Sequence, residues 1–182
     1  MNYKAAEVRN YNFTDEDQLF LDTNIWFYIF GPQEPKYQRN RWMRIYSGAF
    51  KRILKAKSQI YIDVLVLSEF INRYARLKWN VDAPLDTEFK DFRTSQDFEL
   101  VARNITADVK RLLNHCIRIK SGFAALDIDA LLNDYATGDF DFNDQVITEI
   151  CKNNRFTLIT NDSDFKTQAI PILTANHSLL RN

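Results

Sequence analysis

Glycine, proline and cysteine are scarce in this sequence, and each shortage excludes a class of protein. Four glycines in 182 residues include no GxxxxGK[ST] or GxGxxG run, so nucleotide-binding folds that depend on such loops are excluded. Four prolines together with 14% aromatic residues exclude a disordered or repetitive chain. The two cysteines, Cys116 and Cys151, lie in apolar helical patterns without metal-ligand spacing. We interpret them as buried free thiols of a reducing compartment.

An excess of one charge and long apolar runs are also missing. Lys and Arg together number 24, as do Asp and Glu, so net charge alone does not indicate a nucleic-acid partner. No uninterrupted apolar stretch is long enough to span a membrane, and the first residues contain no apolar core of a signal peptide. We therefore expect a cytoplasmic protein with no membrane partner. The 46% hydrophobic content fits one domain with a substantial core.

Short apolar runs alternate with longer amphipathic segments along the chain. The runs predict five strands, at residues 19–22, 59–62, 123–128, 156–160 and 170–173. The spacing of apolar residues predicts helices at 25–30, 36–57, 64–77, 94–119, 130–135 and 143–152. Such alternation is typical of the α/β class, with a parallel sheet between helices. We expect residues 1–17 to form an extended N-terminal arm, and residues 18–182 a single domain with a helical insertion around 80–120.

Acidic residues recur where the predicted strands end. Asp22 closes the first strand, and Asp162 follows the fourth. Asp144 lies in the first turn of the helix before that fourth strand, and Glu69 lies about two turns into the helix after the second strand. Ligands of open parallel sheets bind beyond the carboxyl ends of the strands. We therefore expect at least three of these acids to share one edge of the sheet.

Each acid taken alone also has an ordinary structural interpretation. Asp22 and Asp162 could cap helical turns, typically worth ~1 kcal/mol. The negative charge of Asp144 could interact favourably with the helix dipole, and Glu69 could be a solvated helix residue. Taken together, however, two carboxylates ~4 Å apart repel by about 4 kcal/mol at an effective dielectric constant of 20. Helix capping would not offset several such contacts, whereas Mg²⁺ or Mn²⁺, which prefer oxygen ligands, would. Two such ions can activate water and stabilise the leaving oxygen of a phosphodiester.

Four blocks that contain these acids resemble the PIN-domain family, in particular the VapC-type toxin ribonucleases of toxin–antitoxin systems. The blocks are LFLDTN (19–24), VLSEF (66–70), FNDQVI (142–147) and LITNDSDF (158–165). The resemblance depends on their order, because no block is specific alone.

The resemblance implies a three-layer α/β/α sandwich with a central, mainly parallel five-stranded sheet. It assigns metal binding and catalysis to four carboxylates: Asp22, Glu69, Asp144 and Asp162. It assigns supporting positions to Asn24, Thr160 and Asp164. Asp141 is either an extra acid of the site or a helix cap.

The implied function is an endoribonuclease that uses Mg²⁺ or Mn²⁺ to hydrolyse RNA phosphodiester bonds and leaves 5′-phosphates and 3′-hydroxyls. The resemblance also implies a cytoplasmic homodimer, inhibited by an antitoxin protein that blocks the acidic pocket. Two alternatives stay open: a non-catalytic PIN fold that binds RNA or protein, and a nuclease that acts on structured DNA.

Basic residues are concentrated in one predicted helix. Residues 36–57 contain eight Lys and Arg residues and no acid, which is typical of a surface that holds a phosphate backbone. A solvated face that only keeps the protein soluble explains the same pattern equally well. The residues expected to contact RNA, from this helix and from the helix of Glu69, are Arg39, Arg44, Lys51, Arg52, Arg73 and Arg76.

Overall fold

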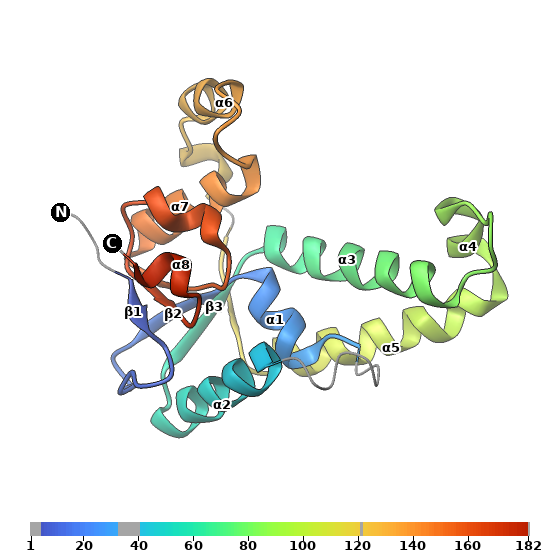
Figure 1. Cartoon of the computed structure of the whole chain (residues 1–182), viewed down its shortest axis with the longest axis horizontal. Helices are drawn as coiled ribbons and strands as arrows, with labels where there is room; N and C mark the ends of the chain where they lie inside the picture. Colours follow the sequence, from blue (N-terminus) through green and yellow to red (C-terminus); the bar gives the residue numbers. More distant parts are fainter. Residues whose placement is uncertain (1–4, 33–40, 121, 182) are drawn as a thin grey trace.

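The computed structural model describes residues 5–32, 41–120 and 122–181 (Figure 1). Six parallel strands form one sheet in the order β1-β6-β5-β2-β3-β4. The strands are β1 (Ala6–Glu7), β2 (Gln18–Leu21), β3 (Gln59–Ile62), β4 (Ile117–Arg118), β5 (Thr157–Ile159) and β6 (Ile172–Thr174). The predicted α/β class with a parallel sheet is confirmed, although the sheet has six strands and not five.

Helices cover the sheet and also extend beyond it. They are α1 (Thr23–Phe30), α2 (Arg41–Ala56), α3 (Val64–Asp82), α4 (Phe89–Thr94), α5 (Gln96–Leu113), α6 (Ile128–Ala136), α7 (Phe142–Asn154) and α8 (His177–Leu180). In Figure 1, α7 and α8 lie on one side of the strands and α2 on the other. No helix in the described part of the chain is long and apolar enough to cross a membrane.

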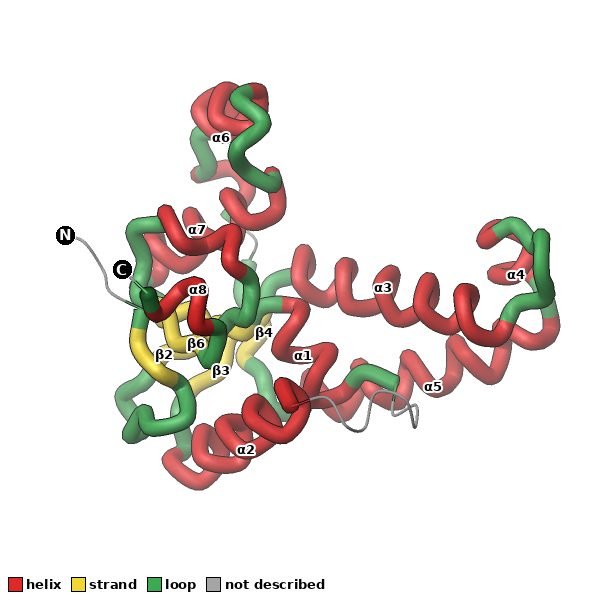
Figure 2. Tube along the Cα trace, in the orientation of Figure 1, coloured by secondary structure: helices red, strands yellow, loops and turns green. Residues whose placement is uncertain are grey.

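The helices α3 and α5 run side by side away from the sheet, with α4 at their far end (Figure 2). The helix predicted at 64–77 continues to Asp82, and its first turn is capped by Asp63, which accepts a hydrogen bond of 2.8 Å from the Leu65 amide. The segment expected as a helical insertion, residues 80–120, contains the end of α3, then α4, α5 and β4.

The central strands are apolar because both faces of the sheet are covered. Leu19, Phe20 and Leu21 of β2 are all buried, and the register places Leu21 opposite Ile159 of β5. The residue after each of these strands therefore lies at the same edge of the sheet. This register brings Asp22 and Thr160 together.

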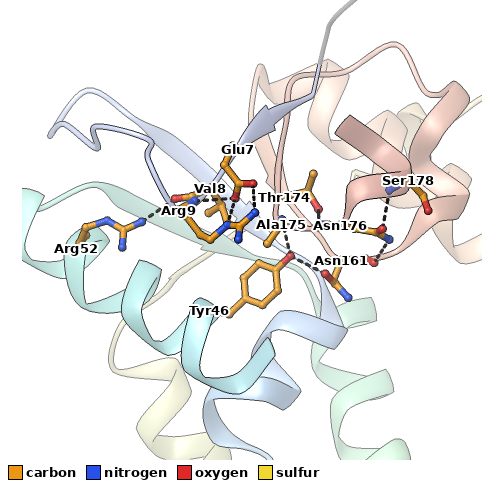
Figure 3. Close-up of polar contacts among 10 residues, drawn as sticks. All are labelled: Glu7, Val8, Arg9, Tyr46, Arg52, Asn161, Thr174, Ala175, Asn176 and Ser178. Carbon is orange, nitrogen blue, oxygen red and sulfur yellow. Dashed lines mark hydrogen bonds and ion pairs between the residues drawn. The ribbon is translucent and has the colours of Figure 1, made fainter. Parts of the chain in front are cut away.

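Two residues of the predicted N-terminal arm, Ala6 and Glu7, are instead part of the sheet, and residues 1–4 lie outside the described residues. Ala6 and Glu7 form β1, which pairs with β6, and the Val8 amide donates a 2.9 Å hydrogen bond to the Thr174 carbonyl. Val8 is fully buried, and its carbonyl accepts a 2.6 Å hydrogen bond from the Arg52 guanidinium of α2 (Figure 3). A strand of two residues is too short for any alternation of apolar and polar residues to reveal it.

The strand predicted at 123–128 is wrong. Phe123–Ala125 form a 3₁₀ turn, and α6 begins at Ile128, capped by Asp127. The strand in this part of the chain is instead β4 (Ile117–Arg118), which pairs with β3. The prediction failed because the apolar spacing of α5 continues to Ile119, although the helix ends at Leu113.

Candidate active site

Asp22 lies between the end of β2 and the start of α1, at the edge of the sheet where the predicted acids were expected. Its side chain is nearly buried, with 6% of the residue exposed. Its Oδ2 atom accepts a 2.6 Å hydrogen bond from the Thr160 hydroxyl and a second, short one from the Asn24 side-chain amide. Asn24 and Thr160, both predicted as supporting residues, therefore fix the orientation of this carboxylate.

The segment after β5 is tied to the same group of residues. The Asp162 amide donates to the Thr160 hydroxyl at 3.0 Å, and the Asn161 amide donates to Asn24 Oδ1 at 3.2 Å. These contacts join the start of α1 to the loop that carries Asp162.

Tyr46 of α2 also contacts this loop (Figure 3). Its hydroxyl lies 2.9 Å from Asn161 Oδ1 and 3.2 Å from the Thr160 carbonyl, and it accepts a 3.0 Å hydrogen bond from the Ala175 amide. Asn176 adds a 2.8 Å hydrogen bond from its side-chain amide to the Asn161 carbonyl. The loop before Asp162 is thus held by a buried phenol and by the chain that follows β6.

Glu69 reaches the site from α3. Its Oε2 atom accepts a 3.0 Å hydrogen bond from the hydroxyl of Thr23, a buried residue in the first turn of α1. Thr23 was not predicted as a site residue, because a threonine at the start of a helix carries no sign of a partner 46 residues away.

The start of α7 supplies two further acids. Asp141 caps this helix, accepting hydrogen bonds from the amides of Asn143 at 2.8 Å and Asp144 at 3.4 Å. Asp141 therefore has the capping role that was one of the two predicted for it.

Asp162 caps the short turn that follows it in the same way, because it accepts a 3.1 Å hydrogen bond from the Asp164 amide.

One pocket of about 250 Å³ collects these side chains. All four predicted metal ligands line it, and two predicted supporting residues and the extra acid Asp141 line it as well. The full lining is Asp22, Asn24, Glu69, Arg73, Asp141, Asn143, Asp144, Asp162 and Asp164. Thr160 lies outside this lining, and its hydroxyl contacts Asp22.

Burial and mutual repulsion raise the pKa of two of these acids. The pKa of Asp144 is raised to about 8, mainly by burial and then by the charges of Asp22, Asp141, Asp162 and Asp164. The pKa of Asp22 is raised to about 6, mainly by burial and then by the charges of Glu69 and Asp162, against the lowering effect of the Thr160 hydrogen bond. The site therefore holds carboxylates in an environment that resists their full ionisation unless positive charge is added.

The donor set of the pocket fits a hard divalent cation, because its lining combines six carboxylates with two side-chain amides. In the described part of the chain, however, no three acidic, histidine or cysteine side chains converge closely enough to enclose an ion. The chemistry of the residues thus matches a hard divalent cation, and the carboxylates would have to move closer together to enclose it.

The residues predicted to contact RNA are not gathered in one place. Of those described, only Arg73 lines the acidic pocket. Arg76 lies over the ring of Phe89, 4.7 Å from its centroid, and Arg52 is engaged with Val8. Arg44 and Lys51 are exposed on α2, and Arg39 lies outside the described residues.

Comparison with known proteins decides the family. The family model of the PIN domain matches residues 19–171. This chain belongs to the PIN domain family. Proteins of this family are generally nucleases, and the acidic pocket lies entirely within the matched range. Comparison with curated protein sequences gives no match.

A solved structure shares the PIN fold with this chain. It is the crystal structure of VapBC2 from Rickettsia felis bound to a DNA fragment from their promoter, with a TM-score of 0.52 and 15% sequence identity. The match covers 86% of this chain and 98% of the other. At this identity the likeness concerns the fold alone.

Proposed function

We propose that this PIN domain is a metal-dependent endoribonuclease and that Asp22, Glu69, Asp144 and Asp162 bind one or two Mg²⁺ or Mn²⁺ ions. The observation that carries the proposal is the pocket of about 250 Å³ with six carboxylates in its lining. Such a group of acids is unfavourable without a compensating cation, since neighbouring carboxylates repel one another and burial penalises their charge.

Hydrogen bonds within the chain would orient the carboxylates that bind the cation. Thr160 and Asn24 hold Asp22 by hydrogen bonds, and Thr23 holds Glu69. Asp141 holds the first turn of α7, which carries Asp144. A divalent cation bound here would neutralise charge on the phosphodiester and make water a better nucleophile at neutral pH.

RNA is proposed as the substrate because the four sequence blocks resemble VapC-type toxin ribonucleases. On the same basis we propose cleavage to 5′-phosphate and 3′-hydroxyl ends, a homodimer, and a protein antitoxin that covers the pocket. The shared fold with a protein of the VapBC2 complex supports a partner of this kind. DNA and a purely RNA-binding function are outcomes that the test below separates.

The test is cleavage of a mixed RNA pool by the purified protein in Mn²⁺, Mg²⁺ or EDTA, beside the Asp144→Asn variant and a mixed pool of structured DNAs. We expect RNA cleavage that requires metal and disappears in Asp144→Asn. The control Asp15→Asn removes an exposed charge outside the pocket lining and should cleave like the wild type. RNA binding without cleavage under any condition would overturn the nuclease and favour the binding module, and preferential DNA cleavage would overturn the choice of RNA.

A further inference from the structure

Arg73 is the positively charged exception in the lining of the acidic pocket. Among the described residues that form this lining, six are carboxylates and Arg73 alone is a cation. It lies on α3, four residues after Glu69, and residues four apart project from the same face of a helix. Glu69 and Arg73 therefore approach the pocket from the same side.

An aromatic ring holds Arg73 in place. Its guanidinium lies 4.9 Å from the centroid of the Phe27 ring, an arrangement in which the ring face attracts the cation. Phe27 is itself fixed by edge contacts with Phe70 at 5.9 Å and Tyr74 at 6.1 Å between ring centroids. The ring thus forms a rigid support beside the pocket.

In the described residues, Arg73 is not ion-paired with the neighbouring acids. Its side chain is exposed. An arginine paired with Glu69 or Asp162 would compete with a cation for that carboxylate. An arginine that rests on a ring keeps its fork of N–H groups available for a planar pair of oxygens, such as those of a phosphate.

We propose that Arg73 binds the non-bridging oxygens of the phosphodiester that is cleaved and stabilises the negative charge that develops on them. This inference rests on the proposed nuclease function and assigns it a catalytic residue besides the carboxylates. Removing one positioned donor that stabilises such charge typically slows the reaction about 100-fold.

Metal affinity separates this role from a structural one. A cation next to a cation site repels the bound ion, so Arg73→Ala should bind Mn²⁺ at least as tightly as the wild type. If Arg73 instead served to hold the carboxylates in place, its removal would weaken Mn²⁺ binding together with cleavage.

The experiment compares single-turnover cleavage of the mixed RNA pool in Mn²⁺ by wild type, Arg73→Ala, Arg73→Lys and Arg103→Ala. Arg103 is an exposed arginine of α5 that pairs with Glu99, so its variant controls for the loss of one positive charge. We expect Arg73→Ala to be about 100-fold slower and Arg73→Lys to be intermediate, because lysine keeps the charge without the fork. Free guanidinium ion, added below denaturing concentrations, should restore part of the rate of Arg73→Ala and leave Arg103→Ala unchanged.

Equal rates for Arg73→Ala and wild type would overturn the inference while leaving the nuclease function intact. A slow Arg73→Ala that has also lost Mn²⁺ affinity in calorimetry, or that guanidinium does not rescue, would overturn it as well. A wild type that neither binds Mn²⁺ nor cleaves RNA would overturn the nuclease function and the role of Arg73 with it.

Discussion

The Thr160 hydroxyl donates a 2.6 Å hydrogen bond to the Asp22 carboxylate and so joins two residues that lie 138 positions apart in the sequence. Thr160 is fully buried, and the same oxygen accepts the Asp162 amide. One hydroxyl therefore links the carboxylate at the end of β2 with the loop that carries the acid after β5.

Replacing Thr160 by valine keeps the shape of the side chain and removes this link. We expect the variant to lose about 1–2 kcal/mol of unfolding free energy, because a buried carboxylate loses a donor. The pKa of Asp22 should rise further, since the Thr160 hydrogen bond lowers it, and Mn²⁺ affinity near neutral pH should fall. Urea denaturation and calorimetry measure the two effects. Thr160→Ser, which keeps the hydroxyl, should restore both, and a Thr160→Val variant with wild-type Mn²⁺ affinity would contradict the expectation.

The raised pKa of Asp144 predicts how the stability of the metal-free protein depends on pH. Its pKa in the folded state, about 8, lies above the ordinary value of 3.8, so between these values the folded protein binds a proton that the unfolded chain releases. Stability should therefore decrease as pH rises through this interval. Asp22, with a folded pKa of about 6, adds to the decrease in the lower part of the interval.

The stability of the Asp144→Asn variant should decrease less as pH rises, because the carboxyl group that causes most of the decrease is gone. Urea denaturation in EDTA at about pH 5 and about pH 8 measures the slope. Asp15→Asn, in an exposed position, should keep the slope of the wild type. A wild type that becomes more stable toward about pH 8 in EDTA would show that Asp144 is not held in its protonated form.

Tyr46 should stabilise both the fold and the site. Tyr46→Phe leaves the buried Ala175 amide without its acceptor and removes the hydroxyl beside Asn161, which should cost about 1–3 kcal/mol. Amide hydrogen exchange at Ala175 should become faster, and RNA cleavage slower, because the loop before Asp162 loses its support. Unchanged exchange at Ala175 in a folded Tyr46→Phe protein would contradict this role.

Arg52 should act mainly on the N-terminal strand. Its guanidinium donates to the Val8 carbonyl at 2.6 Å and lies 5.7 Å from the centroid of the Phe13 ring. Arg52→Ala should cost about 1.5–3 kcal/mol, the usual contribution of a hydrogen bond to a charged group, and should speed hydrogen exchange at the Val8 amide. Lys55→Ala, an exposed residue of the same helix, should do neither. Equal exchange at Val8 in the two variants would show that Arg52 does not hold β1 in place.

Much of the acidic site could be predicted from the sequence because its parts are local. Asp22 and Asp162 directly follow apolar runs, and parallel strands bring such positions to one edge. Glu69 and Asp144 could be placed on helices by the spacing of their apolar neighbours. Knowing the strands and their direction was enough to place Asp22 and Asp162 at one edge of the sheet, whereas the resemblance to the PIN-domain family assigned Glu69 to the same site.

The remaining features depend on contacts that no local pattern records. The strands Ala6–Glu7 and Ile117–Arg118 contain two residues each, too few to show a period. The hydroxyls of Thr23 and Tyr46 reach partners 46 and at least 114 positions away, and either residue would read equally well as ordinary helix surface or core. Basic residues were abundant in the sequence, but only the fold shows that Arg73 lines the pocket while Arg52 holds a backbone carbonyl.

Titration calorimetry with Mn²⁺ is the most direct test of the proposed metal site. It compares the wild type with a variant that carries four substitutions together: Asp22→Asn, Glu69→Gln, Asp144→Asn and Asp162→Asn. These amides keep the size of each side chain and remove its negative charge. We expect the wild type to bind Mn²⁺ and to release protons, because the carboxyl groups with a raised pKa ionise when the cation binds. The folded variant should bind none. Failure of the wild type to bind, or equal binding by the variant, would contradict the proposal that this pocket is a metal site.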